Sequence, residues 1–149
     1  MRSFFASRTM RRFIVPAFVA VIAATLTGCM MFSKPPADLD YSRTRTSESG
    51  AYRATIQPRG DSIPQGKLQS WTLRLETASG APVNVATIGV DGGMPQHGHG
   101  LPTKPRARRV GEGEYLVEGI KFNMGGWWVV KFRVPAPAGS DSIVFNLKV

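Results

Sequence analysis

From Ala51 to Val149 the sequence repeats one pattern: short runs in which apolar and polar residues alternate, separated by turn-forming residues. In the clearest run Trp71, Leu73 and Leu75 alternate with polar residues, as in a strand that buries one face and exposes the other. Further runs lie at residues 51–57, 83–90, 107–110, 115–122, 127–134 and 142–149. Since no segment shows a convincing helical period, the sequence predicts an all-β fold, an antiparallel β-sandwich of about seven strands.

Residues 1–28 are expected to be an export signal that is removed. They contain four arginines, no acidic residue and an apolar run, Phe13–Leu26. A helix needs about 20 apolar residues to span a bilayer, and this run is shorter, as in an export signal. The segment ends in Leu26-Thr27-Gly28-Cys29, which resembles the bacterial lipobox and implies cleavage before Cys29 and acylation of its sulfur. Cys29 is the only cysteine, so it has no disulfide partner within the chain. The sequence therefore predicts a lipoprotein anchored in a membrane through lipid on Cys29; an uncleaved signal anchor or a plain secretory signal is the alternative.

The segment that follows, residues 29–49, is rich in serine, threonine, proline and charged residues and has almost no apolar period. We expect it to be a flexible linker, with the sandwich domain spanning residues 50–149. Met30 stands where an aspartate commonly retains lipoproteins in the inner membrane. This favours a periplasm-facing anchor in the outer membrane, if the cell has two membranes.

The net charge of +9 overstates how basic the exported protein is. Four of the 19 basic residues and none of the 10 acidic residues precede Cys29, so the remaining chain carries +5. This modest excess on an exported domain argues against a nucleic-acid partner. Four basic residues follow the histidines, namely Lys104, Arg106, Arg108 and Arg109. We interpret them as a solvated strand edge that discourages edge-to-edge association; docking of an acidic partner or of lipid headgroups is the alternative.

Both histidines of the chain, His97 and His99, lie in a segment rich in glycine and proline, and Met94 precedes the first by three residues. This composition predicts a shaped loop rather than the inside of a strand. Imidazole binds copper in either oxidation state and thioether sulfur favours Cu(I), so these donors predict a copper site. On an extended segment their spacing puts both imidazoles on one face. Because loops of a sandwich gather at its ends, Met124 in a later loop is a fourth candidate ligand.

Adjacent Trp127 and Trp128 are expected to point to opposite faces of their strand. One indole then enters the core, and the other meets solvent or the loops, where a tryptophan face is able to shield Cu(I) by cation–π attraction. An alternative interpretation of the candidate site involves no metal. In that case Met94 and Met124 fill gaps by packing, and the histidines hydrogen-bond to main-chain carbonyls of the glycine-rich loop.

Two stretches of the chain carry a family resemblance. They are Met94-Pro95-x-His97-x-His99-Gly100-Leu101-Pro102-Thr103 and Gly113-x-Tyr115-x-Val117-Glu118-Gly119-Ile120-x-Phe122-x-Met124-x-Gly126-x-Trp128. The pattern resembles the YtkA-like and FixH-like exported domains over about residues 65–135. The resemblance implies an immunoglobulin-like sandwich tethered to a membrane, and a link to copper handling or cytochrome oxidase assembly. Where relatives often have proline after the second methionine, this chain has Gly125-Gly126, which predicts a looser backbone at Met124.

No motif of an enzyme is present: there is no Gly-x-Ser-x-Gly, no phosphate-binding loop and no reactive cysteine. We therefore expect a non-enzymatic cell-envelope lipoprotein. Its Met94/His97/His99 loop binds copper for delivery, buffering or oxidase assembly, with an envelope protein as copper acceptor or assembly partner. The alternative hypothesis is a metal-free structural or interaction module that docks another envelope protein.

Overall fold

The computed structural model describes residues 34–149 except residues 61 and 138. The expected export signal and the expected lipid attachment site, Cys29, lie outside this range. Residues Pro35–Val149 form one compact unit. No helix suited to crossing a membrane occurs among the described residues.

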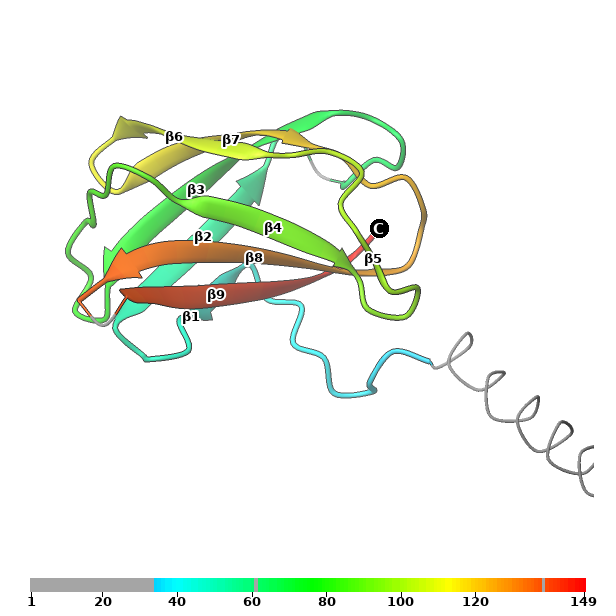
Figure 1. Ribbon diagram of the computed structural model, residues 1–149, viewed down its shortest axis with the longest axis horizontal. Helices are drawn as coiled ribbons and strands as arrows, with labels where there is room; N and C mark the ends of the chain where they lie inside the picture. The colour runs from blue at the N-terminus through cyan, green and yellow to red at the C-terminus, as the bar shows by residue number, and fades with distance from the viewer. Residues whose placement is uncertain (1–33, 61, 138) are drawn as a thin grey trace, which may run out of the picture. The chain divides into compact units, whose positions relative to one another are not determined.

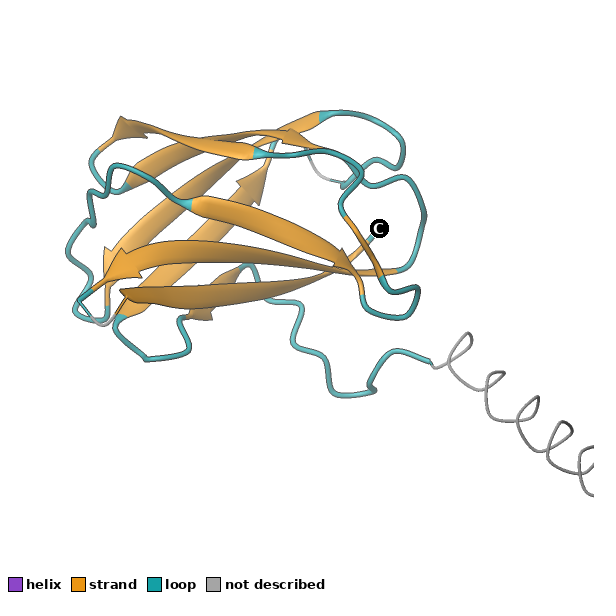
Figure 2. Cartoon of the chain, viewed as in Figure 1, coloured by secondary structure: helices purple, strands orange, loops and turns teal. Residues whose placement is uncertain are grey.

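Two antiparallel sheets build the domain (Figure 1). The strands are β1 (Thr44–Thr46), β2 (Tyr52–Pro58), β3 (Gln69–Thr77), β4 (Gly89–Met94), β5 (His99–Gly100), β6 (Arg106–Gly111), β7 (Glu114–Ile120), β8 (Trp127–Ala136) and β9 (Gly139–Lys148). One sheet has the order β1-β2-β3-β7-β6 and the other β5-β4-β8-β9. All regular structure in the described residues is strand (Figure 2), which confirms the predicted all-β sandwich.

The core lies between the sheets and follows the alternation in the sequence. Trp71 and Leu73 of β3 have no exposed surface, and neither does Phe145 of β9. Near one end of the sandwich the rings of Trp71, Phe122 and Trp128 pack in series, with centroid distances of 5.9 and 5.1 Å. Large aromatic side chains contribute much of the apolar area that a small sandwich buries. This end of the core supports the candidate site.

The linker expected over residues 29–49 ends earlier in the structure. Residues 44–46 form β1, which pairs with β2 in the register Arg45↔Ala54. Main-chain hydrogen bonds hold this short edge strand, so it needs no apolar period in its own sequence. The following turn is also fixed, because the buried Ser47 and Asp141 hold it against β9.

The strand expected over residues 83–90 is shifted. Residues 83–88 are irregular, and β4 begins at Gly89 and continues to Met94. The buried hydroxyl group of Tyr115 accepts a hydrogen bond from Val85 N at 2.7 Å and donates to Val83 O at 3.0 Å. Val83 N also donates to Leu75 O of β3 at 3.0 Å. The Tyr115 side chain thus supplies hydrogen bonds that a neighbouring strand would otherwise make, which explains why apolar residues at 83–88 are packed without forming a strand.

Candidate metal centre

The segment with both histidines is a β-hairpin rather than a free loop. Met94 is the last residue of β4 and pairs with His99, the first residue of β5. The carbonyl group of Met94 accepts hydrogen bonds from His97 N and Gly98 N at 3.1 and 3.0 Å, which close the turn. Gly98 has φ +65°, a conformation that glycine adopts without strain. The expected loop is therefore a tight turn, with Met94 and His99 as cross-strand partners.

Two adjacent glycines let β4 fit between its neighbours. A Cβ atom on Gly92 would lie 2.3 Å from Val129 O of β8, and one on Gly93 would lie 2.4 Å from His99 O of β5. Both distances are too short for any side chain, so only glycine permits this approach. The Gly92-Gly93 pair thus sets the position of β5, and with it the position of His99.

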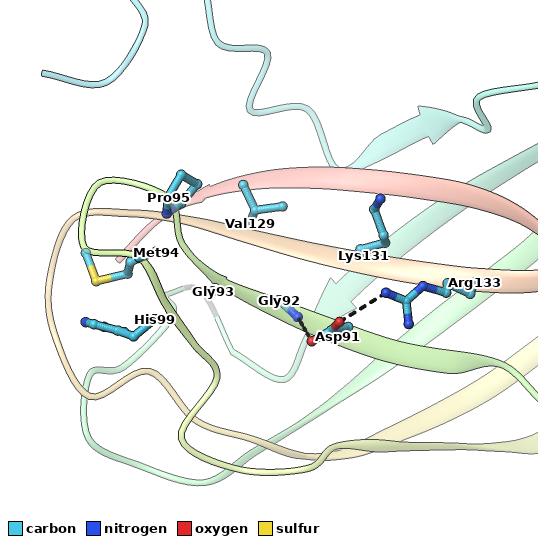
Figure 3. A pocket seen from close by; sticks show the side chains of 10 residues that line it. Asp91, Gly92, Gly93, Met94, Pro95, His99, Val129, Lys131 and Arg133 are labelled. Carbon is cyan, nitrogen blue, oxygen red and sulfur yellow. Dashed lines mark hydrogen bonds and ion pairs between the residues drawn. The ribbon is translucent and has the colours of Figure 1, made fainter. Parts of the chain in front are cut away.

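The thioether group of Met94 is inside the protein. Met94 is only 1% exposed, and a Cβ atom on Gly126 would lie 3.0 Å from its terminal methyl carbon. Directly paired residues of antiparallel strands point to the same face of the sheet. The imidazole of His99 therefore lies on the same side as the sulfur of Met94, and Figure 3 shows the two side chains next to each other.

The two imidazoles lie close together on the surface. The ring centroids of His97 and His99 are 5.7 Å apart, with 24° between the ring planes. Within the described part of the chain neither imidazole forms a hydrogen bond, and both residues are exposed. A centroid lies roughly 3 Å from a metal that its nitrogen binds at about 2 Å, so two imidazoles on one ion are at most about 6 Å apart. The observed separation is within this limit.

Trp128 lies beneath His99 as an aromatic wall. The Trp128 ring is fully buried and its centroid is 6.1 Å from that of His99 in an edge contact. Trp127 is on the opposite face, where its indole donates a hydrogen bond to Asn146 at 3.0 Å. The expectation that one indole enters the core is confirmed. Of the two tryptophans, Trp128 is the one beside His99.

Met124 reaches the same end of the sandwich through its main chain. Its carbonyl group accepts a hydrogen bond from the indole of Trp128 at 3.0 Å, and its side chain is 38% exposed. The glycines after it are not loose in the structure, because Gly126 forms two main-chain hydrogen bonds with Val149, of 2.8 and 3.0 Å. A Cβ atom built on Gly126 would lie 3.0 Å from the methyl carbon of Met94, so the loop of Met124 passes beside the hairpin.

A pocket beside the hairpin is a feature that the sequence did not indicate. It is lined by Met94, Pro95 and His99 and extends over the outer face of β4 and β8 (Figure 3). Arg133 and Asp91, which form an ion pair 3.2 Å long, are among the residues that line it. These two residues are far apart in the sequence and become neighbours only through the pairing of β4 with β8, so no local signal reveals them.

The donors at this end are imidazole and thioether groups. The described residues contain no cluster of three or more histidine, cysteine, aspartate or glutamate residues. The arrangement of His97, His99 and Met94 suits a soft cation that accepts nitrogen and sulfur ligands. The structure brings these three together, and it brings Met124 to the same end through its carbonyl group.

A comparison with protein families gives one match. The chain belongs to the YtkA-like family, whose model matches residues 46–133, a range that includes the hairpin and Met124. Membership suggests an exported domain of the cell envelope. Searches among curated proteins and among solved structures find no significant match.

Proposed function

We propose that this protein is a cell-envelope lipoprotein that binds copper as Cu(I) at the hairpin and passes it to an envelope partner. The supporting observation is the cross-strand pairing of Met94 with His99, with the His97 ring 5.7 Å from that of His99. Two imidazoles and one thioether are a donor set that suits Cu(I). Met124 is a further ligand in this proposal, since its loop passes beside Met94, whose methyl carbon would lie 3.0 Å from a Cβ atom on Gly126.

The environment of the site supports transfer of the ion as well as binding. Both histidines are exposed, so an acceptor protein has direct access to an ion that they hold. Met94 and Trp128 are buried beneath them and form a wall that water does not reach. A soft cation on such a wall is shielded on one side and available on the other, which suits delivery or buffering better than permanent storage.

Copper binding is tested by competition with a Cu(I) chelator of known affinity under reducing conditions. The double variant His97→Ala with His99→Ala is expected to lose affinity by about a hundredfold or more, because two of the donors are removed. Met94→Leu keeps the apolar packing and is expected to lose less. Arg108→Ala with Arg109→Ala changes two exposed residues on β6 and serves as the control. Unchanged affinity in the double histidine variant would show that the site is wrong.

The membrane anchor is tested separately. Acylation of Cys29 predicts that the purified protein is heavier than the polypeptide by the mass of its lipid. Cys29→Ala is then expected to move the protein from the membrane fraction to the soluble fraction. A wild-type protein without added mass at Cys29 would contradict this part of the proposal and would leave the copper site untouched.

A second candidate function is a metal-free docking module. The observation in its favour is the exposed edge strand β6, on which Arg106, Arg108 and Arg109 are all exposed. If this function is correct, capture of an envelope partner survives strong chelators and is lost when residues 94–103 are replaced. Loss of capture on chelation alone would favour the copper function.

A further inference from the structure

One end of the sandwich collects unpaired positive charge. We call it the basic end and define it by the loops 59–68, 101–105 and 121–126 and the adjoining ends of β6 and β9. Main-chain hydrogen bonds hold these parts together, from Gly66 N to Phe122 O at 2.6 Å and from Gly126 N to Val149 O at 2.8 Å. Figure 1 shows the loops gathered around the end of the chain marked C. The hairpin with Met94 and His99 is at the same end.

Most charges of the basic end are positive, although Glu118 of β7 lies opposite Arg106 in the register of β6 with β7. Its basic residues are Arg59, Lys67, Lys104, Arg106, Lys121 and Lys148, and the one acidic residue in the sequence of the three loops is Asp61. None of the six takes part in an ion pair within the described residues. The ion pairs that the structure does contain are elsewhere, for example between Arg53 and Glu76 at 3.0 Å. An anionic surface is the complement of such an end.

Exposed apolar side chains project among these charges. Four large apolar residues of the described chain are exposed, namely Tyr41, Leu68, Val110 and Met124. Leu68 is 70% exposed and follows Lys67 directly, and Met124 is in the loop 121–126. Cations interspersed with projecting apolar side chains are typical of a surface that enters the headgroup region of a membrane. An acidic protein partner would account for the charges but not for a leucine that is 70% exposed directly before β3 begins.

The chain enters the domain beside this end. Tyr41 and Arg43 line a groove together with Ile63 of the 59–68 loop and Lys148 of β9. Asn146 donates a hydrogen bond to Asp40 O at 3.2 Å, which holds the entering segment on β9. Five residues separate Cys29 from Pro35, where the compact unit begins, and the chain between the two spans at most about 20 Å. A lipid on Cys29 therefore keeps the basic end within a short distance of the bilayer.

We propose that the basic end docks on the anionic headgroups of the membrane that holds the lipid of Cys29, with Leu68 inserted between them. This inference rests on the proposed acylation, whereas copper has no part in it. Docking turns the Met94–His99 hairpin toward the membrane surface. An acceptor that takes the ion in this orientation presents its own site close to the bilayer.

The test uses the full chain purified from membranes and reconstituted in vesicles, in the presence of a copper chelator. A polarity-sensitive dye is attached to Leu68→Cys, and in a control chain to Val110→Cys, which is exposed on β6 outside the basic end. With vesicles that contain phosphatidylglycerol, emission from position 68 is expected to shift to the blue, and high salt reverses the shift. Vesicles of phosphatidylcholine alone, and the dye at position 110, are expected to give no shift. Equal emission at both positions in anionic vesicles would overturn the proposal and favour an acidic protein as partner.

Charge-reversal variants test whether the positive charges of the basic end drive docking. Lys67→Glu with Lys121→Glu, made in the labelled Leu68→Cys chain, is expected to lower the ratio of docked to free domain by roughly tenfold or more. Arg108→Glu with Arg109→Glu changes the net charge equally outside the basic end and is expected to leave the ratio within about twofold. Equal effects of the two pairs would show that net charge alone, and not the basic end, drives docking.

A failure of the acylation is visible in the same experiment. The wild-type chain has Cys29 as its only cysteine, so it is expected to take up no dye when the sulfur is acylated. Uptake by the wild-type chain would overturn the acylation on which the docking proposal rests. A loss of copper affinity in other experiments has no bearing on this result.

Discussion

The hydroxyl group of Tyr115 is the clearest single determinant of stability that the structure offers. Tyr115 is 1% exposed, and its hydroxyl accepts from Val85 N at 2.7 Å and donates to Val83 O at 3.0 Å. Tyr115→Phe keeps the ring in the core and removes both hydrogen bonds. The N–H group of Val85 is then left without its partner. We expect the free energy of unfolding to fall by about 2–3 kcal/mol, which combines the lost hydrogen bonds with the cost of a poorly satisfied donor.

Urea unfolding followed by tryptophan fluorescence measures this loss. The midpoint is expected to fall while the slope stays unchanged, since the folded state buries the same surface. Tyr52→Phe is the matched control: its hydroxyl makes one hydrogen bond, to Pro135 O at 3.3 Å, at an exposed site. The control is expected to change stability by less than about 0.5 kcal/mol. If both variants unfold at the wild-type midpoint, the hydroxyl does not hold residues 83–88 in place, and the explanation of their irregular conformation is wrong.

Three further outcomes are expected. Gly93→Ala should separate β5 from β4 and lower Cu(I) affinity. Gly100→Ala is the control and should do neither, because its Cβ atom would lie 3.4 Å from the nearest atom. Amide hydrogen exchange measures the separation of the strands, and chelator competition measures the affinity. Burial raises the pKa of Asp141, but hydrogen bonds from Ser47, Ser49 and Ser142 lower it more, so the pKa lies below its ordinary value. The ionised carboxylate therefore stabilises the fold above about pH 4, and this contribution is lost as the pH falls through the lowered pKa. When urea unfolding is measured at several acid pH values, Asp141→Asn should remove this part of the fall in the free energy of unfolding. Peroxide should oxidise exposed Met124 before buried Met94, as measured by peptide mass spectrometry, and equal rates would contradict the burial of Met94.

The core was predictable from the sequence because it depends on a local pattern. Trp71, Leu73 and Leu75 alternate with polar residues, and all three are fully buried. The last strand behaves in the same way, with Phe145 inside and Asn146 half-buried on the other face. A period of two residues is enough to assign a face to each side chain, and the face decides burial.

Elements held by distant partners were not predictable in the same way. Nothing local in residues 83–88 shows that Tyr115, about 30 residues later, provides their hydrogen bonds. The strand β1 is likewise defined by its pairing with β2 rather than by its own composition. At the candidate site, the sequence indicated the candidate donors His97, His99 and Met94. It did not indicate that a sheet register pairs Met94 with His99, because register is a property of two strands together.

The turn Pro95–Gly98 is separate from the core: none of its four residues is buried, whereas Met94 just before it is. Replacement of His97 in this turn therefore changes a candidate donor atom at the surface without removing a buried side chain, whereas Gly98, with φ +65°, is held to glycine. A lineage that keeps this scaffold is free to gain, exchange or lose an affinity for metal one residue at a time. Stability then depends little on the surface imidazole of His97, whereas the buried thioether of Met94 belongs to the core and to the proposed site at once.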